Sequence, residues 1–230
     1  MTGALADKPY SSSVGDYIKA IWDLGGTRAA STKDVAVRLV VSPASVSNMF
    51  VRLQEMGLVE YERYRGASLT ERGRSEALRL VRRHRLIETF LLEHLGYSWE
   101  DVHAEAGRLE HAVSDEFTER LAEFLGHPGH DPHGDPIPTP EGALEPDDSY
   151  PLSEAREGDE VSIYKVDDED ASMLDYLAAH NLVPGRMLEV REVRKFDAVV
   201  TVQDEDGESH SLGEPLARSI FVQTEPGSGA

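Results

Sequence analysis

Apolar residues recur at helical spacing in the first quarter of the chain and predict three helices. These helices cover residues 17–24, 31–39 and 42–56. The third has the strongest start and stop signals, because Ser42 is an N-cap, Pro43 takes the first helical position and Gly57 ends the helix. Only the short turn Val40-Val41 separates the second helix from the third. The spacing is typical of a helix-turn-helix unit, whose second helix enters the major groove of DNA.

Alternating positions after Gly57 predict two short strands, 58–62 and 67–69, around the tip Arg63-Tyr64-Arg65-Gly66. A basic hairpin behind a helix-turn-helix makes a winged helix and can approach a phosphate backbone. The third helix carries no Arg or Lys in its first two turns. Recognition of a DNA sequence would therefore depend on small polar residues, apolar contacts with thymine and DNA shape. The candidate DNA-binding residues are Ser42, Ala44, Ser45, Ser47, Asn48, Arg52, Arg63 and Arg65.

Three further helices are predicted over residues 70–95, 98–111 and 115–125. His84 and Glu88 stand one turn apart on the first of them. On the second, an arc of about 100° collects four residues on one face: His103, Gly107, Glu110 and His111. Amphipathic helices often carry such residues on solvated faces. Two helices that both present His and Glu favour a divalent-metal site between them, and their apolar stripes favour pairing with a second subunit.

The last third of the chain changes from helical to strand-like patterns. A segment rich in Pro and Gly, 126–151, is a linker by composition. Its three histidines, His127, His130 and His133, are predicted to be mobile surface residues, with stray metal ligands as the alternative. Strands at 159–166, 187–191, 198–202 and 219–222 then predict a small antiparallel barrel. The fold class is therefore mainly α with a small β part. The predicted divisions are a winged helix over 1–74, a helical dimerisation domain over 75–140, a linker over 141–151 and a β-barrel over 152–226.

Composition narrows the chemistry. The 230 residues include no cysteine, which excludes thiolate-ligated zinc and iron–sulfur centres and leaves His, Asp and Glu as metal ligands. The net charge is −20, yet residues 1–74 hold ten Lys and Arg against eight Asp and Glu, so DNA contact is expected from this segment. No apolar run approaches the roughly eighteen residues of a membrane helix, and the N-terminus lacks the pattern of a secretory signal. No membrane partner and a cytoplasmic location are expected.

An enzyme is not expected. The chain has neither a glycine-rich phosphate-binding loop nor a Gly-x-Ser-x-Gly nucleophile turn. A metallohydrolase on the His and Glu residues would lack a nucleophile or general base beyond the ligands. A metal-independent winged-helix regulator, in which those residues are incidental, remains an alternative.

Several spaced motifs, in the correct order, resemble the diphtheria toxin repressor family of metal-dependent repressors, including its manganese-sensing members. These motifs are Val46-Ser47-Asn48-Met49, the segment 82–88, the segment 103–116 and Gly134-Asp-Pro-Ile-Pro138. The C-terminal part is similar to the FeoA-like barrel that many members carry. The resemblance covers residues 10–225.

The resemblance implies two metal sites. One would use Asp16, Glu110 and His111 together with the backbone carbonyl of Gly107, where the family has a Cys or Glu ligand. The other would use four residues: His84, Glu88, His103 and, from the barrel domain, Asp170. Two positions depart from the family: Met173 replaces an amide ligand, and Lys19 replaces an acidic residue of the manganese-sensing members.

Iron-sensing members have a softer Met where this chain has Asp16, and a hard carboxylate favours Mn²⁺ over Fe²⁺. The resemblance therefore implies a homodimeric, manganese-dependent repressor of metal-homeostasis genes such as metal uptake genes, bound to palindromic double-stranded operator DNA. An iron-dependent repressor with Fe²⁺ as the cofactor remains the alternative. Asp16 is expected to couple metal to DNA, because it alone among the ligands lies in the DNA-binding segment.

Overall fold

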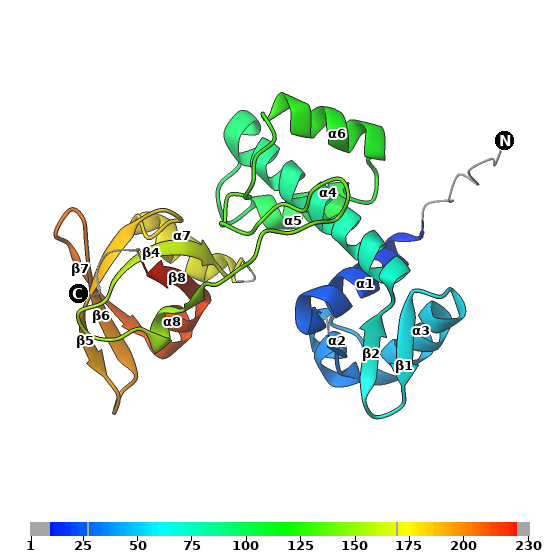
Figure 1. Ribbon diagram of the computed structural model, residues 1–230, viewed down its shortest axis with the longest axis horizontal. Helices are drawn as coiled ribbons and strands as arrows, with labels where there is room; N and C mark the ends of the chain where they lie inside the picture. The colour runs from blue at the N-terminus through cyan, green and yellow to red at the C-terminus, as the bar shows by residue number, and fades with distance from the viewer. Residues whose placement is uncertain (1–9, 27, 169, 225–230) are drawn as a thin grey trace. The chain divides into compact units, whose positions relative to one another are not determined.

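The computed structural model describes residues 10–26, 28–168 and 170–224 of the chain (Figure 1). Two compact units are present. The first comprises residues up to 84 together with 108–114 and 138–143, and the second comprises 85–107, 115–137 and the chain from 144 onward. The longest helix, α4 (Glu71–Leu95), runs through the boundary as one continuous element.

The first unit contains the predicted winged helix. Its elements are α1 (Ser12–Gly25), α2 (Thr32–Arg38), α3 (Pro43–Glu55), β1 (Val59–Glu62) and β2 (Gly66–Leu69). The strands pair antiparallel. The side chains of Ser31 and Ser42 cap α2 and α3 by accepting backbone N–H bonds, as their sequence positions predict. The predicted helices and hairpin are confirmed, although α1 begins five residues earlier than Tyr17.

One apolar core holds these elements together. Phe50 and Leu53 of α3 are fully buried, and the Phe50 ring lies 5.3 Å from the Tyr61 ring of the hairpin. Burial of each such side chain contributes about 1.5–3 kcal/mol. Gly66 has a φ of 100°, and a Cβ there would lie 2.1 Å from the Ala30 carbonyl oxygen, so only glycine lets the wing start against this loop. The wing is thus fixed to the body of the first unit.

Two shorter helices follow α4: α5 (Val102–Leu109) and α6 (Asp115–Phe124). The prediction that the helix continues through His111 is wrong. α5 ends at Leu109, and the Ala112 N–H bonds the Leu109 carbonyl at 2.9 Å, which closes a tighter turn. Glu110 and His111 therefore lie in this turn rather than on the helix.

Part of the Pro- and Gly-rich segment is not a free linker. His133 is fully buried and Asp131 is 7% exposed, so the prediction of a mobile surface histidine is wrong at His133. The backbone of Gly134 lies so close to the following sheet that a Cβ would be 2.2 Å from the Tyr164 carbonyl oxygen. Its φ of 93° also favours glycine. Residues 129–137 are thereby packed into the second unit.

The C-terminal part of the second unit is a six-stranded antiparallel sheet with the order β3-β8-β4-β5-β6-β7. The strands are β3 (Tyr150–Pro151), β4 (Glu160–Val166), β5 (Met187–Arg194), β6 (Val199–Asp204), β7 (Ser209–Gly213) and β8 (Ile220–Thr224). Three short helices accompany them: η1 (Leu152–Glu154), α7 (Ala171–Ala179) and α8 (Glu214–Ser219). Leu174 and Leu177 of α7 are buried with the apolar face of the sheet.

The mainly α fold class with a small antiparallel β part is confirmed. Strand β7 was not predicted, and the pairings among the described residues give an open strand order where a closed barrel was expected. Among the residues that the structure describes, no single helix is long and apolar enough to cross a membrane. Only α2 and α3 taken together, bent by 108°, reach the required length and composition.

Candidate metal centres and DNA-binding surface

Three potential ligands from distant parts of the sequence meet in the first unit. Asp16 lies on α1, and Glu110 and His111 lie in the turn after α5. One ligand atom from each lies within 4.8 Å of the others. His111 Nε2 is 2.8 Å from Asp16 Oδ1 and 3.4 Å from Glu110 Oε1. We call these three residues the first centre.

The second oxygen of Glu110 has its own partners. Oε2 lies 2.9 Å from Lys19 Nζ and 2.5 Å from His84 Nδ1. Burial alone would raise the pKa of Glu110, but the hydrogen bond with His84 and the charge of Lys19 lower it to about 2. The Glu110 carboxylate is therefore ionised at neutral pH.

Gly107 lies on α5, one turn before the first centre. A Cβ built there would meet no heavy atom within 4 Å. A longer side chain at position 107 would therefore start in open space rather than against packed atoms.

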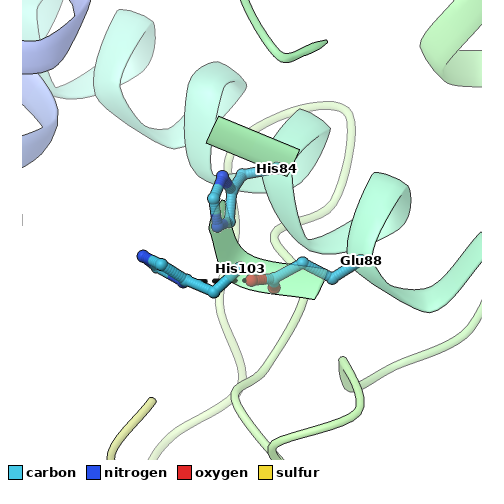
Figure 2. Close-up of side chains that lie close together, drawn as sticks. All are labelled: His84, Glu88 and His103. Atoms are coloured by element: carbon cyan, nitrogen blue, oxygen red, sulfur yellow. Dashed lines mark hydrogen bonds and ion pairs between the residues drawn. The ribbon is translucent and has the colours of Figure 1, made fainter. Parts of the chain in front are cut away.

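A second group forms along α4 and α5. Figure 2 shows His84 and Glu88 projecting from α4, one turn apart, with His103 of α5 beside them, and their ligand atoms lie within 4.8 Å of one another. His103 Nδ1 is 3.1 Å from Glu88 Oε1. The structure thus brings together the three residues that the helical spacing singled out.

The predicted fourth residue of this group, Asp170, lies elsewhere. Its carboxylate caps α7 by accepting the Ser172 N–H at 2.9 Å and the Met173 N–H at 3.4 Å. Asp168, two residues earlier, takes the expected place, with Oδ2 2.8 Å from His103 Nδ1. The start of α7 thus engages Asp170, and Asp168 is the carboxylate that lies beside His103.

The surroundings of His103 favour its protonated form. Burial would lower its pKa, but the hydrogen bonds to Asp168 and Glu88 and their charges raise it to about 10. Burial would likewise raise the pKa of Asp168, and the hydrogen bond and charge of His103 lower it to about 2. A proton on His103 compensates the carboxylates that a metal ion would neutralise.

Sequence reasoning missed two further residues beside Glu88. Asp131 and His133 come from the Pro- and Gly-rich segment, and their ligand atoms lie within 4.8 Å of that of Glu88. Burial, and then the charge of Glu88, raise the pKa of Asp131 well above its usual value. The Asp-x-His spacing was the available signal, but the composition of the segment masked it. We call Glu88, His103, Asp131, His133 and Asp168 the second centre.

The second centre has the features of a metal site. His133 Nε2 lies 3.0 Å from the Trp99 carbonyl oxygen, while its buried Nδ1 has no hydrogen-bond partner among the described residues. A buried imidazole nitrogen without a partner is costly unless a hydrogen-bond donor or a cation meets it. Carboxylate and imidazole donors suit Mn²⁺, Fe²⁺ or Zn²⁺, so the residues of both centres fit a divalent ion.

The candidate DNA-binding residues of α3 and its N-cap are exposed, except for the half-buried Ser47. The serine hydroxyls are engaged locally: Ser42 Oγ accepts the Ser45 N–H at 3.1 Å, and the Ser47 hydroxyl donates to the Pro43 carbonyl at 3.0 Å. The remaining polar side chains of this face are Asn48 and Arg52, one turn apart.

The wing presents its basic tip to solvent. Tyr64 is 91% exposed with a φ of 72°, and the Arg63 guanidinium lies 5.2 Å from the centre of its ring. Arg65 forms an exposed ion pair with Glu62 at 3.1 Å. Both arginines can therefore reach a phosphate without unfolding the hairpin.

Three protein families match consecutive parts of the chain. The family described as "Iron dependent repressor, N-terminal DNA binding domain" matches residues 10–67, and "Iron dependent repressor, metal binding and dimerisation domain" matches 70–139. The FeoA domain matches residues 150–224. The descriptions of the first two families name DNA binding, metal binding and dimerisation.

Individual relatives agree with these families. An uncharacterised HTH-type transcriptional regulator of Methanocaldococcus jannaschii, MJ0568, is 39% identical over 117 residues, which are 50% of this chain and 94% of that protein. The iron-dependent repressor IdeR of Mycobacterium tuberculosis is 38% identical over 123 residues, 53% of this chain and 54% of IdeR. The alignment thus spans about half the length of IdeR.

A solved structure extends the likeness to nearly the whole chain. A manganese-dependent transcriptional repressor in complex with manganese superposes with a TM-score of 0.86 at 39% identity, over 92% of this chain and 99% of that one. The matched families are those of DNA-binding transcriptional repressors rather than of enzymes. The chain belongs to the diphtheria toxin repressor family of metal-dependent transcriptional repressors.

Proposed function

We propose that this protein represses metal-homeostasis genes in response to Mn²⁺, and that it does so as a homodimer on a palindromic operator in the cytoplasm. The observation that carries the proposal is the position of Asp16. It belongs to α1 of the winged-helix unit, and its carboxylate lies 2.8 Å from His111 in the turn after α5. A cation there would join the DNA-binding helices to the metal-binding segment.

The residues of the first centre would perform the coupling. Asp16, Glu110 and His111 would hold the ion, which supplies a double positive charge between carboxylates that otherwise repel. Asp16 is 47% exposed at its side chain and is linked to His111 by a hydrogen bond, and Lys19 of the same helix is paired with Glu110. Ligation would fix α1 and favour the DNA-competent state through its differential affinity for the ion.

Hard donors support manganese as the metal. Asp16 offers a carboxylate where a thioether would favour iron, and the second centre adds three carboxylates and two imidazoles. The similar manganese-dependent repressor supports the same choice. The similarity to the iron-dependent IdeR makes Fe²⁺ the competing candidate.

Dimer formation is supported by exposed apolar side chains around the end of α4 and α6. Phe124 is 64% exposed and Leu95 is 56% exposed. The Phe124 ring packs with Phe90 at 6.0 Å and with His94 at 4.9 Å, so it is held at the surface in a fixed orientation. Together with the matched dimerisation domain, this patch fits a second copy of the chain.

The deciding experiment measures operator binding with each metal. A labelled duplex, selected from a random pool with the manganese-loaded protein, is titrated by fluorescence anisotropy with Mn²⁺, anaerobic Fe²⁺, Zn²⁺ or chelator. We expect tight binding with Mn²⁺ and weak binding with chelator. Equal affinity with chelator contradicts metal dependence, and tighter binding with Fe²⁺ at equal free-ion concentration makes the protein an iron-dependent repressor.

A matched pair of variants tests the second centre. Asp168→Asn should weaken metal binding there by removing a negatively charged donor, whereas Asp170→Asn should not, because asparagine preserves the cap of α7. Calorimetric titration of both variants gives the comparison. Weaker binding only in Asp170→Asn would restore the assignment made from the sequence.

A further inference from the structure

Lys19 lies against a residue of the first centre. It is on α1, three residues after Asp16, and its Nζ is 2.9 Å from Glu110 Oε2. The Lys19 side chain is 17% exposed and the Glu110 side chain 3%. A lysine that is largely withdrawn from water and directed at a buried carboxylate carries a cost that a solvated lysine avoids.

The two oxygens of Glu110 therefore have separate surroundings. Oε1 is 3.4 Å from His111 Nε2, on the side that also holds Asp16. Oε2 is held by the ammonium of Lys19 and by His84 Nδ1. Among the described residues, an ion on the Oε1 side would meet His111 and Asp16, whereas an ion on the Oε2 side would meet the ammonium of Lys19.

We propose that the ammonium of Lys19 acts as a permanent cation beside the first centre. It occupies Glu110 Oε2, so that the centre binds one divalent ion, on the Oε1 side. This inference rests on the proposed function, since it assumes that the first centre binds metal. Lys19 also neutralises Glu110 before metal arrives, so the turn that carries His111 is held in place without an ion.

Charge and donor chemistry both support this role. An ammonium has three donors and no acceptor, so Lys19 cannot ligate a metal. A single and a double positive charge on the two oxygens of one carboxylate repel, which weakens metal binding by about tenfold or more even at the dielectric constant of water. An acidic residue at position 19 would instead add a donor beside Glu110 Oε2 and His84.

Three variants of the full-length chain separate these effects. Lys19→Met removes the charge at similar length, Lys19→Glu converts it into a donor, and Lys19→Arg keeps the cation. Lys33→Met, on α2 of the same unit, is the matched control, because it removes an exposed lysine that belongs to neither centre. Mn²⁺ per chain is measured by equilibrium dialysis with metal analysis, affinity by calorimetry, and metal-free stability by thermal unfolding.

We expect Lys19→Glu to bind one more Mn²⁺ per chain than the unmodified protein. Lys19→Met should bind manganese about tenfold more tightly at the first centre and melt at a lower temperature without metal. Lys19→Arg and Lys33→Met should match the unmodified protein in all three measurements.

Two results would overturn the inference: an unchanged manganese count in Lys19→Glu, or an unchanged affinity in Lys19→Met. If Lys19→Glu does not fold, the affinity and melting temperature of Lys19→Met still decide the question. Failure of the proposed function has a different signature. In that case Asp16→Ala binds as much manganese as the unmodified protein, whatever residue stands at position 19.

Discussion

Replacing the wing arginines should lower the salt dependence of DNA binding by a calculable amount. Arg63 and Arg65 lie at the exposed tip of the hairpin, and the glycine contact at Ala30 fixes the hairpin to the first unit. Each phosphate contact contributes about 0.9 to the slope of log K against log salt concentration on duplex DNA. Arg63→Ala should therefore reduce the slope by about 0.9, and the double variant with Arg65→Ala by about 1.8.

The same slope predicts a change in affinity. Between 50 and 200 mM salt, one lost phosphate contact makes the fall in affinity smaller by a factor of about 3.5. Arg65 must first give up its exposed ion pair with Glu62, which costs at most about 1 kcal/mol. Its effect on affinity should therefore be smaller than that of Arg63, while its effect on the slope is the same.

Fluorescence anisotropy over a series of salt concentrations measures both quantities, at saturating Mn²⁺ and on operator and non-operator duplexes. Arg120→Ala is the matched control, because Arg120 is also an exposed arginine paired with a glutamate on its own element, but it lies on α6. An unchanged slope in both wing variants, or an equal loss of slope in Arg120→Ala, would refute the assignment of the wing to the DNA interface.

Four other substitutions test the remaining parts of the molecule. Asp16→Ala should abolish metal-activated operator binding in a folded dimer, whereas Asp23→Ala, which removes the pair with Arg38 on the same unit, should not. Normal repression by Asp16→Ala in cells would contradict the coupling role. Gly107→Glu should tighten manganese binding at the first centre in calorimetry, because the added carboxylate enters open space; unchanged affinity would show that it does not reach the ion. Phe124→Asp should shift the dimer towards monomer in sedimentation, and a dimer of unchanged strength would remove this patch from the interface. Leu53→Ala should lower the unfolding free energy by about 2–5 kcal/mol in urea titrations, since Leu53 is fully buried, and a loss below 1 kcal/mol would contradict its place in the core.

The helices and the hairpin of the DNA-binding unit could be predicted from short-range sequence signals. Ser42 and Pro43 mark a helix start through backbone geometry that depends on a few neighbouring residues, and the structure has the cap where the sequence predicts it. The pairing of His84 with Glu88 also follows from helix geometry alone. Such features need no knowledge of the rest of the fold.

Long-range contacts account for what the sequence did not reveal. Asp131 and His133 reach Glu88 because Gly134 lets its segment pack tightly against β4, and composition alone indicated a linker. The choice between Asp168 and Asp170 was partly open to local reasoning. A Ser two residues after Asp170 is compatible with a helix cap, and that assignment would have directed attention to the acidic residues just before it, among them Asp168.

The unequal burial of the two centres has a consequence for the rate at which the protein would respond. Asp16 is 47% exposed, so an ion could enter or leave the first centre without any opening of the fold. Glu88 and His133 are fully buried, whereas His103 and Asp168 are partly exposed, so we expect an ion held by the buried donors of the second centre to exchange more slowly. The first centre would then follow the free metal concentration closely, while the second would retain its ion for longer. The second centre would therefore stay occupied for a time after the free metal concentration has fallen.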